Sequence, residues 1–473
     1  MMDEARINAI VAEVVRRLQP AAAGAGSGPT IRVPRHFTGK NGMFEEMDHA
    51  VQAARDAYDQ MHQQPVHVRQ RAIENMRRWT LQNLEEMAKR AVEETGLGRI
   101  ADKIEKNRLV ANKTPGMEIL MPAAQTGDHG LTLDEYGPLG VIGSITPTTN
   151  ATETILNNAI SMIAGGNTVV FNVHPSAKRT LAWFTEKLNQ CCVEAGAPDN
   201  MMTMLTEPTI ETAQALMKHP GIRLIAVTGG GPVVKAALNS GKRAVCAGPG
   251  NPPAVVDETA NLRQAARNII DGASLDNNIV CIVEKEIIAV ASIADELKRQ
   301  LVSEGAYEVK GTELNALEKL LIIDGHVNRK YVGKDAKVIL RDAGIQVSGD
   351  PRIGFAEVSE DHPFVQLEML MPILGFFRVP DWEQAVAAAV RVEHGFLHTA
   401  TMHSMAIDRL DRMAKAVNTS IFVKNAPSFA GLGLRGEGYT AWTIAGTTGE
   451  GLTNARTWTK QRRCTLSGFF RIV

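Results

Sequence analysis

Cys281 is the residue best suited to covalent chemistry, and it lies in the segment 268–286, NIIDGASLDNNIVCIVEKE. An apolar pattern with helical spacing ends at Ser274, and the β-rich run 279–283 is predicted to be a strand that carries the thiol. A thiolate is a strong nucleophile, and nearby hydrogen-bond donors or a helix N-terminus lower its pKa. The alternative is a small core residue, because free cysteine is among the most buried residue types.

The polar run Asp276-Asn277-Asn278 is predicted to cap this loop as turn residues, with orientation of the thiol as the alternative role. The other cysteines are predicted to be structural, within a helix, a buried strand or a late charged stretch: Cys191, Cys192, Cys246 and Cys464. The five cysteines form an odd set without CxxC spacing, which favours a reducing compartment over disulfides or a zinc site. The 12 histidines also lack metal-ligand spacing, so no metal is expected.

Composition indicates a globular protein with two or three domains, because the chain has 473 residues. It is 44% hydrophobic and 22% charged, with a formal net charge of −1. That balance argues against a nucleic acid or an anionic membrane as partner. No apolar run approaches the roughly 18 residues of a spanning helix, and no secretory signal is apparent, so a cytoplasmic protein is expected.

Strands and helices are predicted to alternate from residue 140 onward. The β-rich runs are 140–145, 168–173, 201–205, 222–227 and 243–248, and the helical stretches between them are 151–164, 175–195, 209–218 and 231–239. This alternation predicts a doubly wound parallel sheet with ligands at the carboxyl ends of its strands. Further alternation follows, with helices at 260–273, 381–392 and 406–416, and predicts a second α/β region that ends near residue 437.

Three loops are predicted to lie at the carboxyl edge of the first sheet: 146–150, 174–178 and 228–231. In the last of them, Gly229 and its neighbours can let a phosphate approach the amides at a helix start, although such turns also occur without ligands. Gly431, Gly433 and Gly436 match G-x-G-x-x-G, but no amphipathic helix follows them. We therefore interpret that match as an ordinary loop.

The remaining segments are predicted from their charge and β-rich patterns. Residues 43–113 are expected to form charged helices packed on a domain surface. Residues 117–136 are predicted to form a hairpin, and the β-rich C-terminal stretch is expected to pair with it or with another subunit. Residues 3–18 carry an apolar stripe at helical spacing, followed by a small-residue linker. This helix is predicted to dock on another protein, with folding back or pairing within an oligomer as alternatives.

The motifs together resemble the aldehyde dehydrogenase superfamily. The resemblance identifies Cys281 as the nucleophile, Asn150 of GPLGVIGSITPTTN as an oxyanion-hole donor, and Glu368 of LEMLMP as the ligand of the nicotinamide ribose. His174 replaces the lysine of the usual Lys-Pro motif. The other implied cofactor-binding residues are Thr146, Pro147, Pro175, Thr228, Gly229, Gly230 and Val233.

The resemblance also implies a domain order and an oligomer, either a dimer or a tetramer. It divides the chain into a doubly wound NAD- and CoA-binding domain (31–116 and 137–247), an α/β catalytic domain (248–437) and an oligomerisation element of a hairpin and C-terminal strand (117–136 and 438–473). Residues 1–19 and 20–30 look like the amphipathic targeting helix and flexible linker of members that enter bacterial microcompartments, where the helix would contact the shell or neighbouring enzymes.

One departure from the family decides the expected product. Hydrolytic members place a glutamate in Glu-Leu-Gly-Gly-Lys, whereas the matching stretch here is AGPGN, with Ala247 at the glutamate position. Without that base, water (pKa about 15.7) attacks a thioester poorly, while a thiol of pKa about 8.5 is already partly ionised at pH 7. The chain therefore resembles the CoA-acylating branch, whose members acting on propanal or acetaldehyde share DNNIVC and HPSAK.

We therefore expect a Cys281 thioester that is formed with NAD and transferred to CoA, with propanal preferred and acetaldehyde as the alternative. Three competing interpretations are a hydrolytic aldehyde dehydrogenase, a redox-free thiol acyltransferase or hydrolase, and a non-catalytic shell or scaffold protein. Each explains less of the pattern. A hydrolytic enzyme lacks its base, a redox-free enzyme leaves the cofactor-type sheet without a role, and a scaffold leaves Asn150, Cys281 and Glu368 unexplained.

Overall fold

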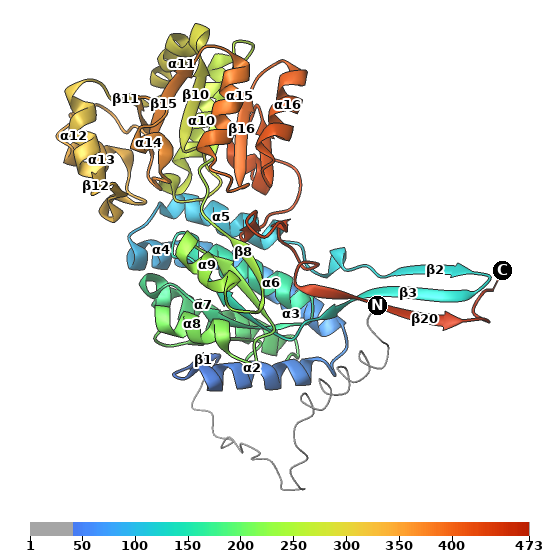
Figure 1. Ribbon diagram of the computed structural model, residues 1–473. Coiled ribbons are helices and arrows are strands. Elements are labelled where there is room, and N and C mark those ends of the chain that lie inside the picture. Colours follow the sequence, from blue (N-terminus) through green and yellow to red (C-terminus); the bar gives the residue numbers. More distant parts are fainter. Residues whose placement is uncertain (1–40, 473) are drawn as a thin grey trace, which may run out of the picture. The chain divides into compact units, whose positions relative to one another are not determined.

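The computed structural model describes residues 41–472 of the chain. The helix predicted at 3–18 and its linker therefore lie outside the described residues. Within them, strands and helices form two α/β regions and a small antiparallel sheet (Figure 1). The predicted α/β fold with parallel sheets is confirmed. No helix among residues 41–472 is both long and apolar enough to cross a membrane.

The first sheet has six parallel strands in the order β1-β6-β5-β4-β7-β8. Its strands are β1 (Met43–Phe44), β4 (Val141–Ile145), β5 (Thr168–Asn172), β6 (Met202–Leu205), β7 (Leu224–Thr228) and β8 (Arg243–Ala247). Its helices are α2 (Met47–Met61), α3 (His67–Gln82), α4 (Leu84–Thr95), α5 (Ile100–Lys113), α6 (Ala151–Ala164), α7 (Lys178–Glu194), α8 (Ile210–Lys218) and α9 (Gly231–Leu238). The chain winds outward from β4 in both directions, so the switch between β4 and β7 is where such a sheet binds ligands.

Burial explains why these elements form where they do. β4 and β5 are apolar runs with every residue buried, as is typical of central parallel strands. α6 is buried along its whole length, and a helix that is covered on all sides belongs in a core. Asn150 is the N-cap of α6, so the packing of this helix fixes that residue at the end of the loop that follows β4.

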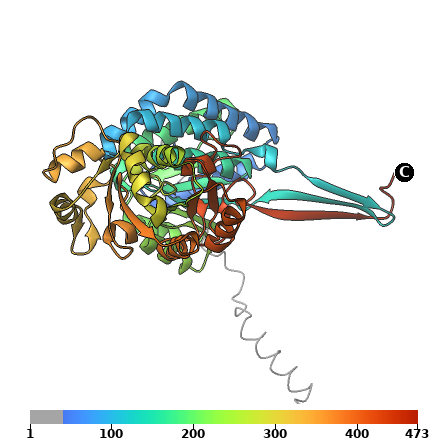
Figure 2. The ribbon, with the colours of Figure 1, turned by 90° about the horizontal axis from the view of Figure 1, so that it is seen from above.

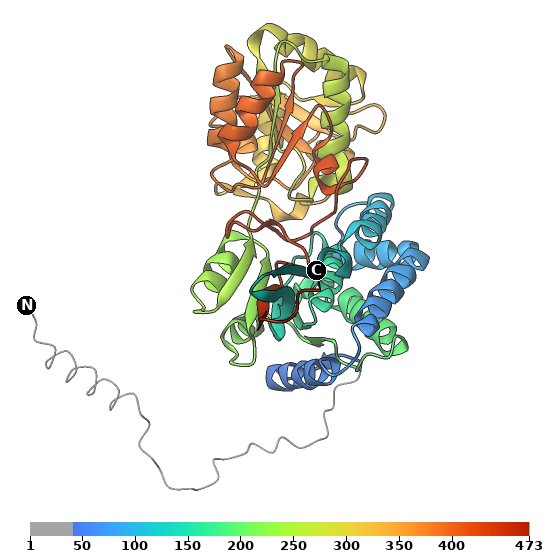
Figure 3. The same cartoon turned by 90° about the vertical axis from the view of Figure 1, so that its right-hand side faces the viewer.

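The second sheet has seven parallel strands in the order β11-β14-β15-β10-β9-β16-β17. Its strands are β9 (Pro253–Val256), β10 (Glu286–Val290), β11 (Tyr307–Glu308), β14 (Gly354–Glu357), β15 (Ile373–Val379), β16 (Thr399–His403) and β17 (Ile421–Lys424). Its helices are α10 (Leu262–Ser274), α11 (Ala291–Ser303), α12 (Thr312–Leu321), α13 (Ala336–Asp342), α14 (Pro363–Gln366), α15 (Trp382–Val392) and α16 (Ile407–Val417). Figure 3 shows helices on both faces of this sheet.

Short elements connect these regions. They are the 3-10 helices η1 (Met117–Ile119), η2 (Pro175–Ala177), η3 (Leu275–Asn278), η4 (Arg329–Tyr331) and η5 (Ser428–Leu432), and the strand pairs β12 (Ile322–Ile323) with β13 (His326–Val327) and β18 (Ile444–Ala445) with β19 (Gly451–Leu452). Gly433 and Gly436 lie in turns after η5, with no α-helix behind them. The prediction that this glycine motif is an ordinary loop is confirmed.

The third sheet is antiparallel and extends away from the two α/β regions (Figure 2). It consists of β2 (Ala123–Gly127), β3 (Gly130–Pro138) and β20 (Thr459–Ser467). β20 pairs along the whole of β3, from Thr459 opposite Pro138 to Ser467 opposite Gly130. The predicted hairpin and its pairing with the C-terminal stretch are therefore confirmed.

Candidate active site

One cavity of about 430 Å³ is lined by residues that follow β4, β5, β7 and β8 and by residues that precede β10 and β15. It thus lies at the carboxyl ends of the first sheet and the amino ends of the second. Every residue predicted for the site lines it: Thr146, Pro147, Asn150, His174, Pro175, Thr228, Gly229, Gly230, Val233, Cys281 and Glu368. Residues from both halves of the chain therefore meet in one place.

The β7–α9 turn has the features of a phosphate-binding loop. Gly230 is the N-cap of α9 and offers no side-chain cap. Gly229 N and Val233 N already donate to Ala247 O and Gly230 O, so the amides of Gly230 and Gly231 are the ones left without a cap. A Cβ atom on Gly229 would lie 3.9 Å from its nearest neighbour, so the protein itself has space there. Unsatisfied amides at a helix N-terminus favour an anion. This turn fits the pyrophosphate of a dinucleotide.

The loop after β4, the strand next to β7, offers polar groups without protein partners. The hydroxyls of Thr146 and Thr148 are buried, and neither has a hydrogen-bond partner among the described residues. Buried hydroxyls normally find a partner, so these two suit a bound ligand. His174 is exposed at the rim, where its Nδ1 accepts a hydrogen bond from Ser176 N at 3.2 Å. The cavity therefore offers polar groups beside apolar walls, and this combination fits a nucleotide.

Cys281 lies in a turn between η3 and β10, so the strand predicted for 279–283 is wrong. The chain reverses just before it, because Asp276, Asn277 and Asn278 have φ angles of 50°, 55° and 68°. Asn and Asp tolerate this left-handed region better than other non-glycine residues. The β-branched residues around the thiol pack into the core beside this turn and do not join the sheet.

Side-chain hydrogen bonds hold this turn in place. Asn277 Nδ2 donates to Gly333 O at 2.9 Å, and Asn278 Nδ2 donates to Ala273 O at 2.7 Å. The prediction of loop-capping residues is confirmed for Asn277 and Asn278, whereas the Asp276 carboxylate instead pairs with two buried lysines on α5. Lys285 Nζ donates to both the backbone oxygen and Oδ1 of Asn278 at 2.7 Å. The thiol is therefore carried by a turn whose backbone is fixed from several directions.

The thiol is not activated by its surroundings. Burial, followed by the negative charge of Glu368, raises the pKa of Cys281 to about 12, against the opposing charges of Lys285 and Lys106. The expectation that neighbouring dipoles lower this pKa is thus not met in the ligand-free protein. At neutral pH Cys281 is a neutral thiol, so its proton has to leave as it attacks.

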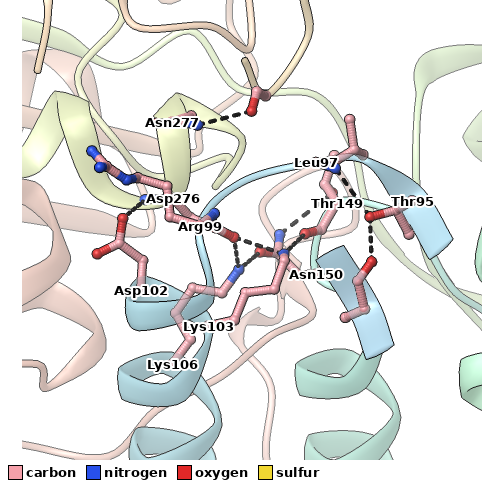
Figure 4. Close-up of polar contacts among 12 residues, drawn as sticks. Thr95, Leu97, Arg99, Asp102, Lys103, Lys106, Thr149, Asn150, Asp276 and Asn277 are labelled. Carbon is pink, nitrogen blue, oxygen red and sulfur yellow. Dashed lines mark hydrogen bonds and ion pairs between the residues drawn. The ribbon is translucent and has the colours of Figure 1, made fainter. Parts of the chain in front are cut away.

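Asn150 is held by a buried ionic cluster that sequence patterns did not indicate (Figure 4). Lys106 Nζ on α5 donates to Asn150 Oδ1 at 2.8 Å and to Asp276 Oδ2 at 2.5 Å, and lies 3.2 Å from Glu153 Oε1. Lys103 Nζ lies 2.9 Å from the same Asp276 oxygen. An ammonium group can only donate, so the Asn150 atom facing Lys106 is the amide oxygen. The NH2 group is thereby left for the cavity, with one contact of 3.5 Å to Thr149 Oγ1.

Comparison with known proteins shows the family of this chain. Residues 37–314 match the aldehyde dehydrogenase family. The acetylating acetaldehyde dehydrogenase EutE of Salmonella typhimurium is 48% identical over 439 residues, which cover 91% of this chain and 94% of that protein. The chain belongs to the aldehyde dehydrogenase family.

Two further similarities refine this result. The CoA-propanoylating propanal dehydrogenase of Salmonella typhimurium is 43% identical over 432 residues, which cover 91% of this chain and 93% of that protein. The solved structure of a propionaldehyde dehydrogenase from the Clostridium phytofermentans fucose utilisation bacterial microcompartment aligns with a TM-score of 0.90 at 46% identity. That alignment covers 91% of this chain and 100% of the solved chain.

A further feature of the cavity is how few carboxylates line it. Ala247 is the last residue of β8 and lines the cavity. Glu368 is the only carboxylate that lines the cavity within the described part of the chain. It accepts a hydrogen bond from Gly250 N at 3.3 Å, and burial raises its pKa. The cavity thus holds one carboxylate, and this carboxylate is tied to the loop after β8.

Gly250 and His398 lie beside the turn that carries Cys281, and sequence patterns did not predict this position for either residue. A Cβ atom on Gly250 would lie 2.8 Å from Cys281 O and 3.0 Å from His398 Cγ, so only glycine fits between the thiol turn and the imidazole. His398 is buried, and its Nε2 has no hydrogen-bond partner within residues 41–472. Burial and the charge of Lys285 lower the pKa of His398 to about 4, so the ring is neutral. No periodicity or spacing distinguishes this histidine in the sequence.

The remaining cysteines lie away from the cavity. Burial raises the pKa of Cys191 to about 12 and of Cys246 to about 11, and it also raises that of Cys192. Cys464 is exposed on β20. None of these four lines the cavity. Across residues 41–472, no group of three or more His, Cys, Asp or Glu side chains is placed to hold a metal ion.

Proposed function

We propose that this aldehyde dehydrogenase is CoA-acylating and converts a short-chain aldehyde, NAD and CoA into an acyl-CoA and NADH. The observation that carries the proposal is Ala247 at the end of β8, in the same cavity as Cys281. A hydrolytic enzyme needs a base there to activate water. With an alanine in that place, the thiol of CoA is the better acceptor of the acyl group, because thiols ionise far more readily than water.

The first half-reaction forms an acyl-enzyme. Cys281 Sγ bonds to the carbonyl carbon of the aldehyde and releases its proton to solvent, while the carbonyl electrons move to oxygen. The Asn150 amide and the Cys281 backbone N–H donate to this oxygen as an oxyanion hole. When bound, NAD supplies the acceptor for the hydride that leaves the carbon, and a thioester remains on Cys281.

The second half-reaction regenerates the thiol. The sulfur of CoA bonds to the thioester carbon, the bond from that carbon to Cys281 Sγ breaks, and acyl-CoA leaves. The proton lost by the CoA thiol balances the one that returns to Cys281. NAD accepts the hydride in the first half-reaction, and CoA accepts the acyl group only in the second. This order gives ping-pong kinetics.

The proposed roles of the other cavity residues come from the resemblance to the family. Glu368 is assigned to the nicotinamide ribose. Thr228, Gly229 and Gly230 are assigned to the phosphates. Thr146, Pro147, His174, Pro175 and Val233 are assigned to the rest of the nucleotide. Two observations support these assignments: the uncapped amides of α9 and the unpartnered hydroxyl of Thr146. CoA is proposed to use much of the same cavity after NADH has left.

Propanal is the proposed substrate, with acetaldehyde as the alternative. The similar proteins named for these two aldehydes are 43% and 48% identical to this chain, so identity does not separate them. A hydrophobic pocket discriminates one methylene by only about 1–3 kcal/mol. A kcat/KM series over C2 to C5 aldehydes, measured with saturating CoA, decides the substrate. A maximum at C3 supports propanal, and a maximum at C2 contradicts it.

Location and assembly are part of the same proposal. We infer that residues 3–18 target the enzyme into a bacterial microcompartment, which would retain a volatile aldehyde. The microcompartment origin of the Clostridium phytofermentans protein supports this inference. Fusing residues 1–30 to a fluorescent protein in a host with shells provides the test, and a diffuse signal contradicts it. A homo-oligomer, a dimer or a tetramer, is supported by the exposed apolar residues Phe469, Phe470 and Ile472 at the end of the antiparallel sheet.

The main experiment compares steady-state NADH formation with and without CoA. We expect CoA to be required for turnover beyond the first, with acyl-CoA as the product. Equal rates with and without CoA, together with free acid as the product, would instead establish hydrolysis. Cys281→Ala provides the second arm, and CoA-dependent NADH formation by this variant would contradict the assigned nucleophile. Cys464→Ala, at an exposed site on β20, is the matched control and should keep full activity.

A further inference from the structure

We propose that Lys106 is a positioning residue for the oxyanion hole: it holds the Asn150 side chain so that the amide NH2 group faces the reacting oxygen. This inference rests on the proposed function, in which Asn150 stabilises the charge that develops on the aldehyde oxygen. Lys106 lies on α5, in a stretch whose charge pattern predicted a helix on the domain surface. It is instead fully buried.

The contact with Asn150 has a direction that no neutral neighbour would enforce. Lys106 Nζ lies 2.8 Å from Asn150 Oδ1. If the amide turned over, its NH2 group would face an ammonium group, and two donors would meet in a buried site. Leaving a buried donor without an acceptor costs about 1–3 kcal/mol, and more for a charged group. Lys106 therefore selects one of the two amide orientations.

The charge of Lys106 is maintained by its surroundings. Burial alone would lower the pKa of Lys106, but Asp276 and Glu153 together raise it above its ordinary value. Asp276 Oδ2 also receives Lys103, while Asp276 Oδ1 accepts a hydrogen bond from Arg99 N at 2.7 Å. Two ammonium groups thus face two carboxylates in this cluster. A buried lysine can persist as a cation only when it is paired in this way.

The need to neutralise Asp276 does not by itself explain why Lys106 is buried here. Lys103 is also buried, lies on the same helix and already pairs with the same Asp276 oxygen at 2.9 Å. Lys106 differs from Lys103 in two contacts, the hydrogen bond to Asn150 Oδ1 and the 3.2 Å ion pair with Glu153 Oε1. Through Asp276, Lys106 also contacts the turn that carries Cys281. One side chain therefore connects both donors of the oxyanion hole, the Asn150 amide and the Cys281 backbone N–H.

The test uses Lys106→Met, with Lys103→Met as the matched control. Each variant removes one buried ammonium group from Asp276, but only Lys106→Met also removes the contacts with Asn150 and with Glu153. The readout is the rate of the NADH burst after mixing enzyme, aldehyde and NAD without CoA, because this rate reports acylation alone. We expect Lys106→Met to slow the burst by up to roughly 10²-fold, the loss typical of one oxyanion-hole donor. Lys103→Met should lose less thermal stability, because Glu153 keeps its partner, and should change the burst far less.

A double-mutant cycle separates positioning from the general effect of a nearby charge. If Lys106 acts through Asn150, then Lys106→Met should slow the burst of an Asn150→Ala enzyme by less than about threefold. A loss that is as large in that background as in the wild type would overturn the proposal, because it would mean that Lys106 acts without Asn150. Equal losses for Lys106→Met and Lys103→Met would overturn it as well.

Lys106→Gln covers the case in which Lys106→Met does not fold. A glutamine can still donate to Asn150 Oδ1 without a charge, so it should retain more of the burst rate than Lys106→Met, or than Lys106→Leu if the methionine variant is insoluble. A glutamine enzyme no faster than the apolar variant would contradict positioning. Because the burst needs no CoA, a failure of the CoA-acylating proposal appears separately, in the steady-state comparison with and without CoA. A wild-type protein that gives no burst at all contradicts both proposals.

Discussion

The carboxylate of Glu368 and the thiol of Cys281 line one cavity, and the negative charge of Glu368 contributes to the raised pKa of Cys281. Burial is the larger cause, and together the two effects keep the nucleophile of the ligand-free enzyme protonated at neutral pH. A group that binds at Glu368 and changes its charge or its distance from the thiol would therefore also change the reactivity of Cys281. In the proposed mechanism that group is the nucleotide.

Glu368→Gln should lower the pKa of Cys281. The thiolate is disfavoured by burial and by the adjacent negative charge, and this substitution removes the charge. The alkylation rate of Cys281 by iodoacetamide should therefore rise with pH at lower values than in the wild type. The measurement follows the Cys281 peptide by mass spectrometry, and Glu383→Gln, on the exposed surface of α15, is the control. An unchanged or upward-shifted profile would show that Glu368 does not hold the thiol neutral.

Asn150→Ala should slow acylation while leaving NAD affinity intact. The variant removes one donor to the developing oxyanion, and such losses cost about 10²–10³ in turnover. Stopped-flow absorbance of the NADH burst measures the effect. Asn239→Ala, at the exposed C-terminal end of α9, should behave as the wild type. A burst rate within a few-fold of the wild type would remove Asn150 from the oxyanion hole.

Ala247→Glu should introduce aldehyde hydrolysis. The new carboxylate would lie at the end of β8, in the cavity, where it can activate water to attack the thioester. We expect steady NADH formation without CoA and release of the free acid, with a lower Tm because the site is buried. Ala247→Gln has nearly the same size but no base, so it should lower the Tm without giving CoA-independent turnover. Equal hydrolysis by both variants would contradict the role of the carboxylate.

Gly229→Ala should weaken nucleotide binding without affecting the fold. The added Cβ meets only an ordinary contact at 3.9 Å within the protein, so the free energy of unfolding should change by no more than about 0.5 kcal/mol. The KM for NAD should rise because the methyl group occupies space next to the phosphates. Gly231→Ala is the control, since its Cβ meets nothing within 4 Å and Gly231 does not line the cavity. If both variants bind NAD as the wild type does, the phosphates lie elsewhere.

The residues that line the cavity could be predicted from the sequence better than the residues that hold them in position. The strand–helix rhythm after residue 140 predicted where β4, β5, β7 and β8 end, and the topology of a doubly wound sheet brings those ends to one edge. Thr146, His174 and Gly229 could therefore be assigned to one cavity in advance. The turn of Cys281 could not be assigned correctly, because a β-branched run predicts a strand, and tertiary packing overrode that preference here.

Lys103 and Lys106 show why the rest could not be predicted. A lysine in a charged helix is usually exposed, and burying it is unfavourable unless a carboxylate lies beside it. That carboxylate is Asp276, 170 residues further along the chain from Lys106. No local pattern connects the two positions. For the same reason, the raised pKa of Cys281 depends on Glu368 and on burial, which only the folded chain brings together.

The pairing of β3 with β20 has a consequence for how the protein is made. Thr132 and Thr465 share a hydrogen bond across these strands although they are 333 residues apart in the sequence. On the ribosome, the β2–β3 hairpin therefore emerges long before its third strand and exposes an unpaired edge while the rest of the first α/β region and all of the second are synthesised. Exposed edges recruit strands from other chains. Neighbouring nascent chains on one polysome can therefore mispair at β3 until β20 has been synthesised.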